Sequence, residues 1–82
     1  MSHPVDILTQ FFIKNNKESL LNPIIQKTNY LISNCTSEKD DIWCDFVKYL
    51  NEKIKDQKWK SDFFRKFYSS LRNFLKSSNP HF

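Results

Sequence analysis

Glycine and alanine are both absent from this sequence of 82 residues. Walker-type phosphate loops, dinucleotide-binding fingerprints and EF-hand calcium loops all require glycine at positions where a side chain would clash. The tight turns of two-residue β-hairpins usually need it as well. These nucleotide and calcium sites are therefore excluded. Helices must also end without a glycine cap, and Asn34 and Asn79 are well placed to serve instead.

Long apolar runs are absent too. The longest has three residues, as in Phe11-Phe12-Ile13, whereas a membrane-spanning helix needs about 20. The N-terminus lacks the basic region and apolar run of a secretory signal. We therefore expect a cytoplasmic protein in which Cys35 and Cys44 are free thiols.

Residues suited to metal binding or catalysis are few. Because the two histidines stand at positions 3 and 81, no zinc-ligand spacing arises and no metal site is expected. Cys44 lies inside a predicted helix without a histidine to activate it, so we interpret it as a semi-buried packing residue. Asp41 and Asp45 share a helical face, but the helix dipole explains acids in a first turn. The sequence predicts neither an enzyme nor a cofactor site.

Aromatic and charged residues are abundant. The chain is 16% aromatic and 27% charged, and each buried aromatic removes about 150–250 Å² from water. A chain of 82 residues corresponds to a single domain. We expect one helical domain over residues 1–76 and a frayed tail over 77–82.

Apolar residues recur at spacings of three and four along most of the chain, and no segment shows clean strand alternation. The pattern predicts an all-α fold, a compact bundle of three to four short helices. The expected helices run from a Ser2 cap to about residue 14, over 23–33, from about 38 to 54, and over about 57–76. The last is long, basic and aromatic.

The start of the second helix depends on Pro23. Proline in a helix interior costs about 3 kcal/mol, so we expect Asn22 as the cap and Pro23 as the first helical residue. The alternative is a single helix that is kinked at Pro23.

The limits of the third and fourth helices follow from their capping residues. Ser37 followed by Asp40 resembles a capping box for the third helix. A turn near 55–57, with Asp56 as the next cap, is favoured over one continuous helix from 38 to 76. Helices of that length are far above the usual 10–14 residues.

Charge is distributed unevenly along the chain. Residues 1–52 carry five lysines and seven acids, a net charge of −2, whereas residues 53–76 carry eight cations and two acids, a net charge of +6. Such asymmetry indicates a charged partner.

The fourth helix carries most of this positive charge on one side. On a helical wheel, Lys58, Arg65, Arg72 and Lys76 form a basic row nearly opposite the aromatic face. The solvent-exposed side of any amphipathic helix would show the same pattern of charged residues. The aromatic arc, however, spans about 180°, more than one packing contact in a small bundle covers. We therefore predict a partner-binding surface made by the basic row, with Trp59 and Tyr68 at the margins of the arc.

These features favour a small non-catalytic module that binds an acidic protein surface as an adaptor, inhibitor or stoichiometric regulator. Nucleic-acid binding by the same basic row is the first alternative. A structural subunit or a homodimer is the second, with Asp41, Asp45 and Glu52 of one copy facing the basic row of another. An anionic membrane surface is disfavoured, because the whole chain has core-forming character.

Overall fold

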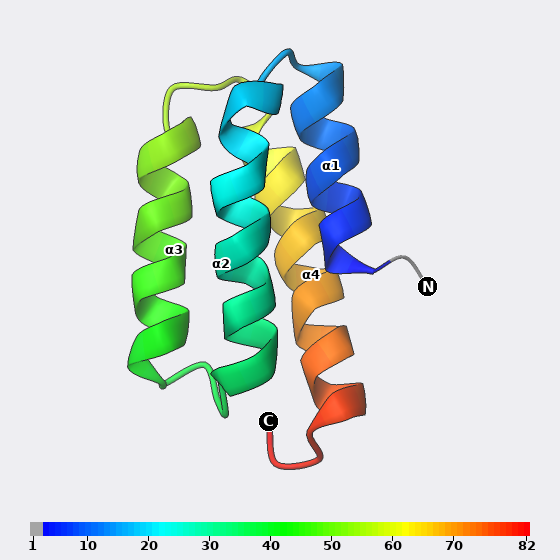
Figure 1. Ribbon diagram of the computed structural model, residues 1–82, viewed down its shortest axis with the longest axis vertical. Helices are drawn as coiled ribbons and strands as arrows, with labels where there is room; N and C mark the ends of the chain where they lie inside the picture. Colours follow the sequence, from blue (N-terminus) through cyan, green and yellow to red (C-terminus); the bar gives the residue numbers. More distant parts are fainter. Residues whose placement is uncertain (1–2) are drawn as a thin grey trace.

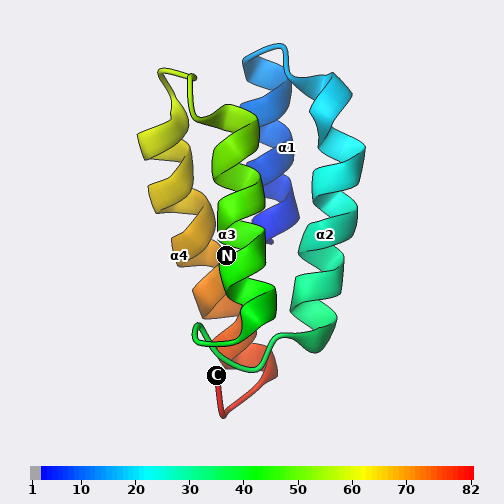
Figure 2. The ribbon, with the colours of Figure 1, turned by 90° about the vertical axis from the view of Figure 1, so that its left-hand side faces the viewer.

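The computed structural model describes residues 3–82, which form four α-helices and a short 3₁₀ turn (Figure 1). The elements are α1 (Pro4–Lys14), η1 (Glu18–Leu20), α2 (Leu21–Asn34), α3 (Asp41–Ile54) and α4 (Lys60–Ser78). Successive helices run in opposite directions. α1 packs beside α2 and α4, α2 packs beside α3, and Figure 2 shows α3 next to α4. The expected all-α bundle is therefore confirmed, with four separate helices.

The core is built from the apolar stripe of every helix. Phe63 and Phe67 of α4 stack 5.1 Å apart, and their rings reach Phe12 of α1 and Phe46 of α3 at 5.6 and 6.0 Å. The buried polar residue, Thr28, donates its hydroxyl to the Ile24 carbonyl at 2.8 Å. The aromatic side of α4 is therefore mostly a packing face. The fully buried apolar residues are Pro4, Leu8, Phe12, Ile24, Leu31, Leu50, Ile54, Phe63, Phe67, Leu71 and Leu75.

The bundle exposes about as much surface as a compact monomer of its size. Its accessible surface is 5331 Å², and the scaling law for folded monomers gives about 5200 Å² for a 9.9 kDa chain. The four helices thus enclose one core.

Side-chain caps begin α1 and α3. His3 caps α1, with its Nδ1 accepting from the Val5 amide at 3.1 Å, and Ser2, the expected cap, lies outside the described residues. Asp40 caps α3 by accepting from the Ile42 amide at 3.0 Å. Asn16 adopts φ 60° after α1, a conformation usually left to glycine and tolerated by asparagine.

The start of α2 differs from the prediction. The helix begins at Leu21, directly after η1, so that Pro23 is its third residue rather than its first. Asn22 is therefore not the cap. Pro23 is tolerated because the first four amides of a helix have no partner within it, and α2 runs as one helix from Leu21 to Asn34.

The starts of α3 and α4 also differ from the prediction. Ser37 does not cap α3, because its hydroxyl accepts locally from the Lys39 amide at 3.2 Å. The turn expected near 55–57 is confirmed, but it extends further and α4 begins at Lys60 without a side-chain cap, so Asp56 has no capping role.

The C-terminal residues are more ordered than a frayed tail. α4 continues to Ser78 instead of ending at residue 76. The chain then turns back, and the Phe82 ring lies 5.8 Å from the Trp43 ring. Burial of a terminal aromatic side chain explains this difference.

Candidate functional site

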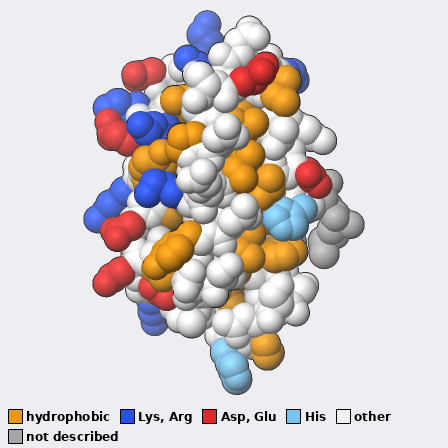
Figure 3. All heavy atoms as spheres, in the orientation of Figure 1, with side chains coloured by type: hydrophobic (Ala, Val, Ile, Leu, Met, Phe, Trp, Pro, Cys, Tyr) orange, Lys and Arg blue, Asp and Glu red, His pale blue; other side chains and the backbone are white. Residues whose placement is uncertain are grey.

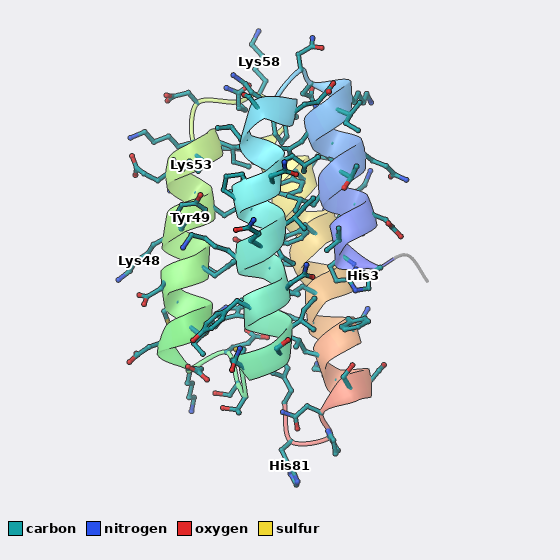
Figure 4. All side chains as sticks on the ribbon, in the orientation of Figure 1. His3, Lys48, Tyr49, Lys53, Lys58 and His81 are labelled. Atoms are coloured by element: carbon teal, nitrogen blue, oxygen red, sulfur yellow. The ribbon has the colours of Figure 1, made fainter. Side chains whose placement is uncertain are left out.

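The four cations of the predicted basic row are distributed over α4 and the turn before it. Arg65, Arg72 and Lys76 lie on α4, where Arg65 and Lys76 are exposed and Arg72 is half-buried, whereas Lys58 precedes the helix. Figure 4 shows Lys58 projecting from the upper end of the bundle. The structure thus keeps three members of the row on one helix and places the fourth at its N-terminal end.

Arg72 is held by contacts across the bundle. Its Nε donates to Glu38 Oε1 at 2.7 Å, and its guanidinium lies 5.5 Å from the centre of the Trp43 ring. Glu38 belongs to the loop between α2 and α3, 34 positions away in sequence. Arg72 therefore ties this loop to α4, and its charge is partly neutralised.

Arg65 is the most exposed arginine of the row. Its side chain is 73% exposed and donates to Asp62 Oδ1 at 2.6 Å, while Lys66 Nζ lies 3.4 Å from the other oxygen of the same carboxylate. The hydrogen bond from Arg65 lowers the pKa of Asp62. One carboxylate thus faces two cations, which leaves this part of α4 positive.

Trp59 and Tyr68 are half-buried rather than displayed at the surface. The Trp59 ring packs on Phe12 and Phe63 at 5.4 and 5.8 Å. The Tyr68 ring packs on Trp43 at 5.8 Å, and its buried hydroxyl has no hydrogen-bond partner among the described residues. Burial raises the pKa of Tyr68. Neighbouring helices therefore cover much of the wide aromatic arc.

Sequence reasoning missed a groove between α2 and α3. Its cavity has a volume of about 280 Å³, and Tyr30, at 60% exposed, stands at its rim. Lys27 and Lys53 lie 4.6 and 5.3 Å from the centre of the Tyr49 ring. Hydrophobic side chains gather on this face, with lysines among them (Figure 3). The signal available in the sequence was Tyr30, an aromatic residue outside the apolar stripe of its helix.

The two cysteines have different environments. Cys35 is buried, and burial raises the pKa of its thiol. Cys44 is exposed, contrary to the semi-buried position expected. Neither forms a disulfide.

Within residues 3–82, no group of three or more metal-ligating side chains could hold a metal ion. None of the four described helices is long and apolar enough to cross a membrane.

A small antiparallel four-helix bundle with a basic fourth helix is the class of protein that these features define. Comparisons with protein families, characterised proteins and solved structures found no match to this chain.

Proposed function

We propose that this protein is a non-catalytic protein-binding module that contacts an acidic partner surface through the outer side of α4. The observation that carries the proposal is the exposed, positively charged side of a helix whose opposite side is fully anchored in the core. Such a helix is rigid, so the backbone positions that carry its cations are fixed before binding. Preorganisation of this kind reduces the entropic cost of association.

Arginine chemistry supports the choice of an acidic protein. Arg65 and Arg72 present planar guanidinium groups that match carboxylates in a two-pronged geometry. Arg72 already donates to the Glu38 carboxylate and lies against Trp43, which is the kind of contact a partner carboxylate would make. Lys58 and Lys76 extend the positive side at both ends, while Trp59 and Tyr68 support it from within.

A titration of ¹⁵N-labelled protein with poly-L-glutamate tests the proposal with a defined acidic polypeptide. We expect the largest amide shifts over residues 65–76. The double variant Arg65→Glu and Lys76→Glu leaves the Glu38–Arg72 pair intact and should abolish those shifts. Shifts centred elsewhere would refute the assignment.

The matched control is Lys39→Glu with Lys48→Glu, which changes the net charge equally. Both lysines are exposed and lie off α4, so this variant should still bind. Affinity capture from the source cells then uses the natural protein, the control variant and the α4 double variant. The natural partner is the protein that the first two capture and the α4 double variant does not. If both variants lose partner binding equally, the loss reflects the change in net charge and not the surface of α4.

A further inference from the structure

The fold brings two lysine-bearing turns together at one end of the bundle. The end of α1 and the turn after it carry Lys14 and Lys17, and the end of α3, the turn that follows and the first residue of α4 carry Lys53, Lys55, Lys58 and Lys60. Both turns lie at the upper end in Figure 1. We call these six residues the lysine end.

Packing beneath the two turns holds them side by side. The Trp59 ring, between Lys58 and Lys60, contacts the Phe11 and Phe12 rings at 6.2 and 5.4 Å. The Lys17 amide in turn donates to the Phe12 carbonyl at 2.7 Å. The two groups of lysines, about 40 residues apart in sequence, are therefore fixed to the same buried aromatic cluster.

Most of this charge is unpaired. Glu18, Glu52 and Asp56 are the acids of the same segments, and Glu52 accepts from Lys55 at 2.8 Å. Lys53 lies against Tyr49. The other four lysines of this end form no side-chain ion pair within residues 3–82: Lys14, Lys17, Lys58 and Lys60.

The lysine end offers little apolar surface to a partner. Among the described residues, the exposed large hydrophobic side chains are Ile13 and Tyr30, and of these only Ile13 lies near this end. Trp59 is turned inward against the phenylalanines. Protein interfaces depend on a desolvated apolar or aromatic centre, and membrane-surface helices insert an apolar face. Neither feature is present here.

We propose that the lysine end binds the phosphate backbone of a nucleic acid duplex without sequence selectivity. Lysine ammonium groups neutralise phosphates as point charges, and the release of counterions supplies the affinity without an apolar contact. The bundle is 26 Å wide across its second axis. A duplex segment of that length carries about 15 phosphate charges, so several phosphates can face the four unpaired lysines.

This inference goes beyond the protein-binding proposal and uses a different surface. Only Lys58 belongs to both the basic row and the lysine end, so it is left unchanged in the test. Either proposal can then fail without the other.

The experiment is a fluorescence anisotropy titration of a labelled 20-base-pair duplex at 50 to 200 mM salt. Contacts from four lysines predict a slope of log affinity against log salt of about −3.6, and a roughly 150-fold loss over this range. The triple variant Lys14→Gln, Lys17→Gln and Lys60→Gln retains one of these contacts. Its affinity should fall only about 3.5-fold over the same range.

The matched control, Lys27→Gln with Lys39→Gln and Lys48→Gln, removes the same charge from other exposed positions and should keep the steep slope. Arg65→Gln with Lys76→Gln should keep it as well, which separates this site from the α4 surface. Thermal unfolding of each variant verifies that the bundle is folded. Equal loss of slope in the matched control would overturn the proposal. Tighter binding to phosphatidylserine vesicles than to the duplex would also overturn it.

Discussion

The hydroxyl of Tyr68 is buried without a hydrogen-bond partner in residues 3–82, while the ring packs against Trp43, Phe64 and Phe67 at 5.4–5.8 Å. A buried polar group that lacks a partner costs about 1–3 kcal/mol. Tyr68→Phe removes this hydroxyl and preserves the ring contacts. We expect the variant to be more stable by about 1 kcal/mol at pH 7, which corresponds to a rise in Tm of about 4–8 °C.

The stability that Tyr68→Phe gains over the natural protein should increase with pH. Burial raises the pKa of Tyr68 above its ordinary value of 10.0, because the phenolate would lose its hydration. Above pH 10 the unfolded chain releases this proton while the folded chain retains it, so the stability of the natural protein falls as pH rises. By pH 11 the advantage of Tyr68→Phe should grow by about 1.4 kcal/mol.

Urea unfolding followed by circular dichroism at pH 7 and pH 11 measures both effects. Tyr30→Phe is the matched control, because Tyr30 is 60% exposed and its hydroxyl is free to contact water. Its stability should change little at pH 7. A Tyr68→Phe variant that is less stable than Tyr30→Phe would refute the reasoning, since the Tyr68 hydroxyl would then have a stabilising partner in solution.

Four further predictions concern the rest of the bundle. A double-mutant cycle with Glu38→Gln and Arg72→Gln should give a coupling of about 0.5–1 kcal/mol in urea unfolding, because both side chains are about 40% exposed; a coupling near zero would contradict a stable pair. Amide and hydroxyl donors, the Ile42 amide first, lower the pKa of Asp40 below its ordinary 3.8. The ionised Asp40 carboxylate should therefore stabilise the fold above pH 3.8, and this stabilisation should be lost as the pH falls further. The variant Asp40→Asn should not show this loss of stability in acid, whereas the control variant Asp41→Asn should still show it. Phe63→Ala removes a fully buried ring and should cost about 3–5 kcal/mol, enough to abolish cooperative thermal unfolding in a domain of this size; a melt near that of the natural protein would be inconsistent with the core described. Sedimentation over a range of concentrations should give a monomer, as the compact surface suggests, and a dimer would favour the self-association alternative.

The periodicity of the sequence was enough to predict the helices and most of the core. Phe63, Phe67 and Leu71 recur every fourth residue and are fully buried, because a stripe at this spacing must face the interior of any stable bundle. Helix limits were less predictable. Ser37 and Asp40 are both good caps, and only the local geometry of the loop made Asp40 the residue that caps α3.

The candidate site depended on the tertiary structure. A helical wheel places Arg72 in a basic row but cannot show that Glu38, 34 positions away, approaches it. A helical wheel also cannot show whether a neighbouring helix covers the edge of the aromatic arc. In the structure, α1 covers Trp59 and α3 covers Tyr68.

The sequence alone thus determined an all-α chain without glycine-dependent nucleotide sites, with its positive charge concentrated after residue 52. The tertiary structure decided which charges are paired and which are free. It also joined Lys14 and Lys17 to the lysines around Trp59. The physical reason is that helix formation and amphipathicity depend on neighbours three and four residues apart. Ion pairing and surface charge depend instead on distances between segments, and packing of the core sets those distances.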